Sequence, residues 1–308
     1  MATARNPLSF DEVNPATAEA VHEYHAEASV LEADLMQPIE EKIAPRVKVK
    51  LPKDGHYQFK HADPFRVEGI LSYKTGYTQV AGHPSSKSDG FATLTTSVLE
   101  DVNVLDVVTA DRVVAQISTV HPAYGTGQVP SVTFLGTRFD NLRIGGHKVE
   151  IVPALKIVGT RSADDTSYFD DPEVKNRFAQ QYETISTHPE LTDEVRRFFP
   201  KGGQPWLQKN GNVSSMSCSL IDNVKGIDQA HGSPFGHVID VPHFGRIYLG
   251  ELKINREAGN PAKQVNDKYT FELTMIRLEM GCLAKGTAKV AMADSNGTGK
   301  GSPPPPTP

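Results

Sequence analysis

The alternation of apolar and polar residues predicts a protein built mainly of β-strands. Between Val47 and Leu51, apolar side chains alternate with Lys48 and Lys50, which is the period of a half-buried strand. Runs rich in β-branched and aromatic residues, separated by Gly and Pro, continue along most of the chain. The further segments expected to form strands are 66–73, 77–80, 91–99, 104–120, 132–135, 142–144, 149–152, 213–221, 237–241, 246–255, 269–280 and 287–293.

Two places in this pattern carry specific turn information. Gly145–Gly146 separates two apolar alternations, and this predicts a tight hairpin turn because glycine accepts the positive φ angles that such turns require. Segment 104–120 is expected to form two strands, or one strand bent around Ala110–Asp111.

Two other stretches have helical periodicity. Residues 15–43 repeat apolar side chains at roughly helical spacing, which predicts an N-terminal helix or docked arm within 1–45. Residues 161–205 predict a helical insertion that packs on the sheet, with Trp206 anchoring its exit.

The insertion is expected to hold two helices. Asp170 or Asp171 caps the first, which begins at Pro172 and turns one apolar face to the sheet. That face holds Val174, Phe178 and Tyr182. The second runs from Pro189 to Phe199, with a cap near Ser186 or Thr187.

Together these elements predict a mainly β fold with a β-sandwich-like body. The expected parts are an N-terminal helix or arm (1–45), a first β half (46–160), the helical insertion (161–205), a second β half (206–293) and a disordered Gly/Pro-rich tail (294–308). Residues 91–102 and 213–224 match in pattern, so a relation between the two β halves stays open.

Composition excludes some partners. The formal net charge is −5, the pI is about 6.1, and no Lys/Arg cluster is present, so we expect no nucleic-acid partner. No segment approaches the roughly 20 apolar residues needed to cross a bilayer, so we expect no membrane insertion. The first ten residues lack the pattern of a signal peptide, which predicts a cytoplasmic protein.

The sequence offers no catalytic set, metal site or cofactor motif. His22 and His25 would share one face of the expected N-terminal helix, but no third ligand lies at a diagnostic distance. His231, His237 and His243 are six residues apart, a spacing that neither a helix nor a single strand explains as a ligand set. Cys218 and Cys282 either pair with each other or stay half-buried free thiols.

Several strand segments carry a resemblance to known proteins. The segments are 103–112, 134–146, 236–251 and 273–278, and their sequences resemble the core of a group of uncharacterised bacterial proteins. The order of these motifs, over residues 65–293, distantly resembles the choice-of-anchor P family of surface proteins. The resemblance implies a β-sandwich-like body and association with the cell surface. It carries over no catalytic residue.

Three functions follow as hypotheses. The first is a non-enzymatic β protein that acts through protein–protein or self-association surfaces, motivated by Ser/Thr alternation at 93–97 and 215–219 that would leave polar strand faces for a partner. The second is a sandwich that binds a small molecule or carbohydrate. Its cleft residues would be Trp206, Tyr124, His243 and Tyr248. The third is a hydrolase that pairs His243 with Glu251 or Asp240.

Overall fold

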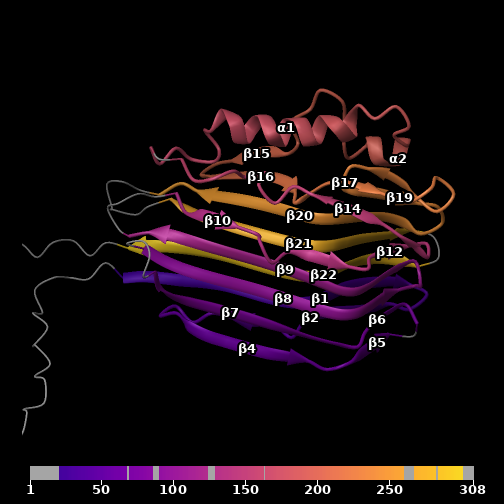
Figure 1. Cartoon of the computed structure of the whole chain (residues 1–308), viewed down its shortest axis with the longest axis horizontal. Coiled ribbons are helices and arrows are strands. Elements are labelled where there is room, and N and C mark those ends of the chain that lie inside the picture. Colours follow the sequence, from indigo (N-terminus) through magenta and orange to yellow (C-terminus); the bar gives the residue numbers. More distant parts are fainter. Residues whose placement is uncertain are drawn as a thin grey trace, which may run out of the picture.

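The computed structural model describes residues 21–67, 69–85, 90–123, 129–162, 164–259, 267–281 and 284–300. It confirms a mainly β protein with a sandwich-like body, made of large antiparallel sheets and two helices (Figure 1). In the described part of the chain, neither helix has the length and apolar character needed to cross a bilayer.

The first large sheet, sheet A, joins the N-terminal segment to the C-terminal third of the chain. Its main strand order is β15-β16-β20-β21-β22-β1-β2, with β3 beside β1 and the β18–β19 hairpin beside β20. Its strands are β1 (Val21–Gln37), β2 (Glu41–Arg46), β3 (Val49–Lys50), β15 (Leu207–Asn210), β16 (Val213–Ser219), β18 (Ser233–Phe235), β19 (Val238–Val241), β20 (Gly245–Glu257), β21 (Lys268–Gly281) and β22 (Lys285–Lys300).

The second large sheet, sheet B, is formed by consecutive segments of the chain. Its main order is β13-β12-β9-β8-β6-β5; β7 also pairs with β8, β4 with β7, and both β10 and β11 with β9. Its strands are β4 (His56–Ala62), β5 (Phe65–Val67), β6 (Leu71–Tyr73), β7 (Thr75–Ser85), β8 (Gly90–Val104), β9 (Val108–Pro122), β10 (Ser131–Thr133), β11 (Arg138–Asp140), β12 (Arg143–Ile144) and β13 (His147–Lys148). A short pair, β14 (Glu150–Pro153) and β17 (Ile221–Lys225), completes the strands.

The two sheets share one core. Its largest cluster of buried side chains combines residues of both sheets, for example Val113 and Ile117 of β9 with Phe271 and Leu273 of β21. The two expected β halves therefore do not form separate cores.

Polar side chains also lie between the sheets. Thr95 Oγ1 donates to the backbone oxygen of Asp294 (3.1 Å), and Ser97 Oγ donates to that of Ser29 (2.9 Å). Thr95 and Ser97 are fully buried, as is Thr93. The expectation that this Ser/Thr alternation leaves a polar face for a partner is wrong for β8, because all three side chains are buried between the sheets and the Thr95 and Ser97 hydroxyls bind the backbone of the facing sheet.

The described part of the N-terminal segment, from residue 21, forms strands, so of the two expectations for 1–45, a helix or a docked arm, the helix is wrong there. β1 pairs with β22 along nearly its whole length. Alternate residues from His22 to Ala28 are buried, which is a period of two and not of 3.6. His22 and His25 consequently point to opposite faces of sheet A and cannot share a metal ion.

The expected tail begins too early. β22 continues through Asp294 to Lys300 and pairs with β1 as far as Lys300 and with β21 as far as Gly297. Ser295 and Asn296 are buried. Residues 294–300 are therefore part of a strand, and the prediction of a disordered tail is wrong for them. The rest of it, 301–308, lies outside the described residues.

Two of the turn predictions have clear outcomes. Gly145 and Gly146 both have positive φ (57° and 82°) between paired strands β12 and β13, which confirms the tight hairpin turn. Segment 104–120 does not bend at Ala110–Asp111. Its turn lies at Leu105–Asp106, where both residues have positive φ, and β9 then runs straight through the expected bend.

The pattern match between 91–102 and 213–224 does not extend to the structure. Residues 91–102 lie within one strand, β8. Residues 213–224 are divided at Leu220 between β16 in sheet A and β17 in the short pair. The two segments therefore occupy different structural settings.

Candidate ligand-binding site

Helix α1 (Pro172–Ser186) lies along the β15–β16 edge of sheet A (Figure 1). It begins as predicted, with the Asp171 side chain accepting from the backbone NH groups of Glu173 and Val174 and with Pro172 in the first turn. Val174, Phe178 and Tyr182 are buried, which confirms the predicted apolar face. The second helix, α2 (Asp193–Arg196), is shorter than predicted, and its cap is Thr192, not Ser186 or Thr187.

A glutamine attaches α1 to the sheet. The Gln181 amide donates to the backbone oxygens of Ser219 (3.0 Å) and Ile221 (3.2 Å), and its oxygen accepts from the Ser219 NH (2.7 Å). At this point the chain leaves β16 for β17, so the side chain supplies hydrogen bonds that a neighbouring strand would otherwise make. This fixes the distance between the helix and the sheet.

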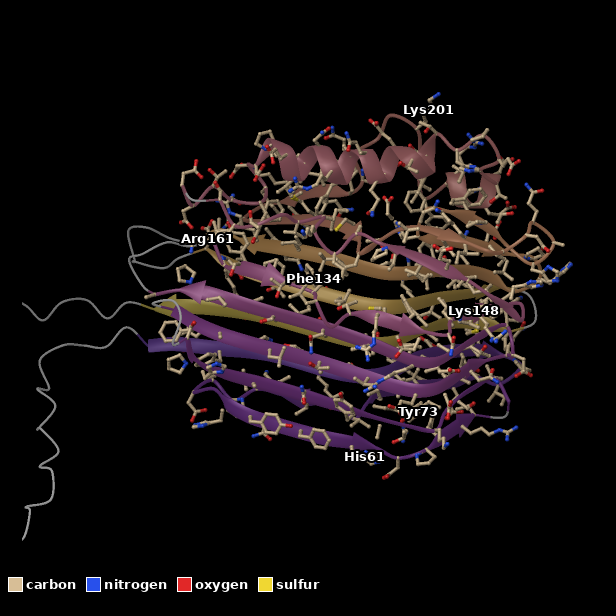
Figure 2. All side chains as sticks on the ribbon, viewed as in Figure 1. His61, Tyr73, Phe134, Lys148, Arg161 and Lys201 are labelled. Atoms are coloured by element: carbon tan, nitrogen blue, oxygen red, sulfur yellow. The ribbon has the colours of Figure 1, made fainter. Side chains whose placement is uncertain are left out.

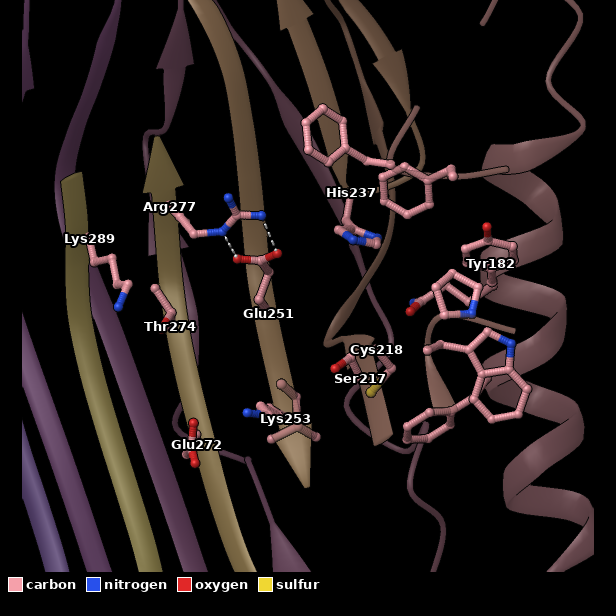
Figure 3. A pocket seen from close by; sticks show the side chains of 17 residues that line it. Tyr182, Ser217, Cys218, His237, Glu251, Lys253, Glu272, Thr274, Arg277 and Lys289 are labelled. Atoms are coloured by element: carbon pink, nitrogen blue, oxygen red, sulfur yellow. Dashed lines mark hydrogen bonds and ion pairs between the residues drawn. The ribbon is translucent and has the colours of Figure 1, made fainter. Parts of the chain in front are cut away.

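A cavity of about 320 Å³ lies between the helical insertion and sheet A (Figure 3). Its wall is mainly aromatic. The ring of Trp206 lies 6.1 Å from that of Phe178, and the ring of Tyr182 lies 5.6 Å from that of Phe199. The Tyr182 hydroxyl donates to the backbone oxygen of Pro200 (2.8 Å), which holds the returning chain against the helix. Phe198 also lines the wall.

The floor is the outward face of strands β20, β21 and β22. It carries charged and polar side chains, namely Glu251, Lys253, Glu272, Thr274, Arg277 and Lys289. Arg277 binds Glu251 through two hydrogen bonds, Nε to Oε2 (2.6 Å) and Nη2 to Oε1 (2.8 Å), drawn in Figure 3. Lys289 forms an ion pair with Glu32 (2.6 Å).

The Arg277 side chain has further partners behind the cavity. It also binds Glu279, and its guanidinium carbon lies 3.6 Å from the centre of the Tyr248 ring. Arg246 binds the other oxygen of Glu279 (2.6 Å), and the Tyr248 hydroxyl donates to the same oxygen (3.2 Å). The floor at this end is a connected network whose charges are already neutralised.

Lys253 differs from the other two cations of the floor. It is exposed, and within the described residues no carboxylate lies within 4.0 Å of its ammonium group. Of the cations that line the cavity, Arg277 pairs with Glu251 and Lys289 pairs with Glu32. Lys253 is therefore the floor cation that remains available to a ligand.

His237 lines the same cavity and is 7% exposed. Its Nδ1 atom is buried and has no hydrogen-bond partner among the described residues. Burial, together with the nearby Arg277 charge, lowers the pKa of His237 to about 3, so the ring is neutral at ordinary pH. An unsatisfied buried polar atom costs about 1–3 kcal/mol, and a ligand in the cavity would be one source of a partner.

A row of carboxylates continues from the floor across sheet A. Glu272, Asp294 and Glu27 lie directly opposite one another on β21, β22 and β1. Burial, and then the charges of Glu272 and Glu27, raise the pKa of Asp294 to about 7. Like charges placed directly opposite each other destabilise a sheet, so Asp294 relieves the row by holding a proton.

The structure brings together only part of the predicted cleft. Trp206 lines the cavity, and Tyr248 lies just behind it, buried under Arg277. His243 lies in the turn between β19 and β20 and does not line the cavity. Tyr124 lies outside the described residues.

The residues expected for a hydrolase have other roles. Glu251 is bound by Arg277, and Asp240 accepts a hydrogen bond from the Thr192 hydroxyl (3.0 Å). Cys218 is a buried free thiol, and burial raises its pKa well above the ordinary value, which disfavours a reactive thiolate. Cys282 lies outside the described residues.

Sequence reasoning missed Lys253, Arg277 and His237 as site residues. The sequence shows which residues of β20 and β21 are polar and therefore face outward. It does not show which charged residues lie beside each other, because that depends on strand register. The alternation also changes phase along one line across sheet A, where two consecutive residues are buried in each strand. These pairs are Val30–Leu31, Val290–Ala291, Met275–Ile276 and Leu249–Gly250.

A family model described as "Domain of unknown function (DUF8256)" matches residues 22–255. The chain belongs to this family. Membership agrees with the resemblance to an uncharacterised family, while the choice-of-anchor P resemblance is not supported by the match. No curated protein and no solved structure matches the chain. The DUF8256 match covers α1, Trp206, His237 and Lys253, but it ends before β21 and β22, which separate β20 from β1 in sheet A.

Proposed function

We propose that this DUF8256 protein is a non-enzymatic binding protein that holds a small amphipathic anion in the cavity beside α1. The supporting observation is Lys253, a cation with no carboxylate partner among the described residues, on a floor that faces an aromatic wall. An aromatic or aliphatic ligand body would pack on Trp206 and Phe178, as is usual for small-molecule sites, which are mostly apolar with a few placed polar groups. The acidic group of the ligand would bind Lys253.

The hydrogen-bond partners in the cavity favour an acid, because both carboxylates of the floor have a donor and Lys253 has no carboxylate partner among the described residues. The carboxylates of Glu251 and Glu272 are engaged by Arg277 and by the Asn255 amide (2.6 Å), respectively. A second ligand group with a hydrogen-bonding atom would reach toward His237. The preferred ligand is therefore a planar carboxylic acid with a further polar atom.

A panel of aromatic carboxylates and their matched neutral amides tests this function by thermal unfolding. We expect carboxylates to raise the melting temperature more than the amides, because only the former pair with Lys253. A ligand at about 100 times its dissociation constant stabilises the folded state by about 2.7 kcal/mol. Lys253→Ala should remove the difference between acid and amide. Lys209→Ala, an exposed lysine of β15, is the matched control and should respond as the wild type.

Two outcomes would contradict the proposal. One is a melting temperature that no acid of the panel moves. The other is a Lys253→Ala variant that responds to the acids as strongly as the wild type does.

A second candidate function is self-association through β4, in line with the first hypothesis drawn from the sequence. β4 is an edge strand of sheet B that pairs, within the described residues, with β7 alone. Tyr57 and Phe59 on its outer face are 57% and 49% exposed, and Phe59 stacks on Tyr77 at 5.7 Å. An exposed aromatic edge strand is a ready template for another strand.

The location of the protein, in the cytoplasm or at the cell surface, stays a prediction from the sequence.

Light scattering on a size-exclusion column tests this association. We expect the wild type to elute at a multiple of 33.6 kDa and the double variant Tyr57→Lys/Phe59→Lys to elute as a monomer. Leu135→Lys is the control, because Leu135 is 83% exposed but lies in the turn between β10 and β11. A monomeric wild type, or a double variant that still associates, would remove this candidate.

A further inference from the structure

Three side chains of metal-binding type meet at one end of the sandwich, away from the cavity. They are His147 of β13 and Asp228 and His231 of the segment between β17 and β18. One donor atom from each lies within 4.8 Å of the others. Figure 2 labels Lys148, the next residue after His147, at this end of the molecule.

The backbone holds these residues in place. His147 follows the Gly145–Gly146 turn and pairs with Ile144 across the hairpin. A Cβ on Gly145 would lie 3.3 Å from the Cβ of His231, so the glycine allows the 228–231 segment to pack closely on the turn. The Asp228 carboxylate accepts from the backbone NH of His231 (3.1 Å), which closes that segment on itself.

The side chains themselves form a compact donor set. The rings of His147 and His231 lie 4.0 Å apart, tilted by 48°. Asp228 Oδ1 lies 2.5 Å from His231 Nδ1. Two imidazole rings this close can ligate one cation between them, and the carboxylate adds a negative charge to the donor set.

We propose that His147, Asp228 and His231 bind a divalent transition-metal ion of the zinc class. Two imidazole nitrogens and one carboxylate oxygen suit zinc, whose ligands in a tetrahedral site lie roughly 3.3 Å from one another. The donors can reach that spacing by side-chain rotation, because Asp228 and His231 are largely exposed (61% and 42%). Water would complete the coordination.

Such an ion would join two parts of the fold. His147 belongs to the terminal hairpin of sheet B, and the 228–231 segment leads from the short β14–β17 pair to β18 of sheet A. The ion would therefore connect the two large sheets at this end. Because it binds the folded arrangement and not the unfolded chain, it would also raise the stability of the protein.

Equilibrium dialysis of the full chain against zinc, after removal of any affinity tag and treatment with a chelator, tests the site. We expect one zinc ion per chain and a higher melting temperature in its presence. His147→Ala and His231→Ala should each weaken binding at least tenfold and lose the shift in melting temperature. His61→Ala is the matched control, since His61 is an exposed histidine that also lies beside an aspartate, Asp63 (3.9 Å).

The variants also distinguish zinc bound at this site from zinc bound by other exposed histidines. His147 is half-buried and the side chain of His231 is exposed, so both replacements should leave the fold intact, which circular dichroism of the zinc-free variants checks. Absence of zinc binding by the wild type would overturn the proposal. So would His147→Ala and His231→Ala variants that bind zinc as tightly as the wild type or as His61→Ala does.

Discussion

Replacing Arg277 with Met should lower the free energy of unfolding by about 3 kcal/mol, the low end of the range for breaking a buried ion pair. Arg277 binds both Glu251 and Glu279, and its side chain is 25% exposed. Methionine keeps much of the volume but leaves two half-buried carboxylates on neighbouring strands. Arg246 would still neutralise Glu279, so Glu251 is the group that loses its partner.

Urea denaturation followed by fluorescence of Trp206 measures this effect. Arg138→Met provides the control, because Arg138 pairs with Asp140 on the surface (3.3 Å) with half of its side chain exposed. Surface pairs of this kind contribute about 0–1 kcal/mol. If Arg277→Met is no more destabilising than Arg138→Met, the network behind the cavity does not hold sheet A together as described.

Lowering the pH from 7 to 5 should destabilise the protein through its buried histidines. Burial lowers the pKa of His22 to about 4 and those of His121 and His237 to about 3. In the unfolded chain these histidines bind protons near pH 6.5, whereas in the folded chain they stay neutral until the pH is much lower. Their contribution to stability is therefore fully present above pH 6.5 and is lost as the pH falls. Each histidine contributes a loss of about 2 kcal/mol between pH 7 and 5.

Asp294 acts with the opposite sign. Its folded pKa of about 7 lies above the ordinary 3.8, so the folded chain binds the extra proton and gains stability as the pH falls from 7. Asp294→Asn should therefore lose about 2 kcal/mol more between pH 7 and 5 than the wild type does, and His121→Gln about 2 kcal/mol less. Comparing the change between two pH values within each variant cancels the packing cost of the substitution.

Urea titrations at pH 7 and pH 5 on the three proteins measure these differences. The two variants should move the pH dependence in opposite directions around the wild type. An identical pH dependence in all three would mean that neither His121 nor Asp294 titrates as its surroundings dictate.

Local chemistry made several elements predictable. The Asp171–Pro172 start of α1 and the Gly145–Gly146 turn depend on residues next to each other in sequence, and both were predicted correctly. The strands 246–255 and 269–280 were found because buried and more exposed residues alternate along most of each strand, for example at 250–255 and 269–275.

The predictions were wrong where the structure of a segment depends on residues far away in the sequence. β1 has the Ala and Glu content of a helix but lies between β22 and β2, and pairing with these strands overrides its intrinsic preference. The alternation of Thr95 and Ser97 with apolar residues predicts that their hydroxyls are exposed, but they are buried and bind the backbone of β22 and β1. The cavity depends on helix α1 and on strands β16, β20, β21 and β22, whose register no local pattern supplies.

The tryptophan fluorescence of the protein tests the central claim most directly, because Trp206 is the single tryptophan of the chain and lines the cavity. Titration with an aromatic carboxylate that absorbs where tryptophan emits should quench Trp206 in a saturable way in the wild type. The same titration should be at least tenfold weaker in Lys253→Ala and unchanged in Lys209→Ala. Emission that stays constant, or that is quenched equally in Lys253→Ala, would contradict an anion-binding cavity beside α1.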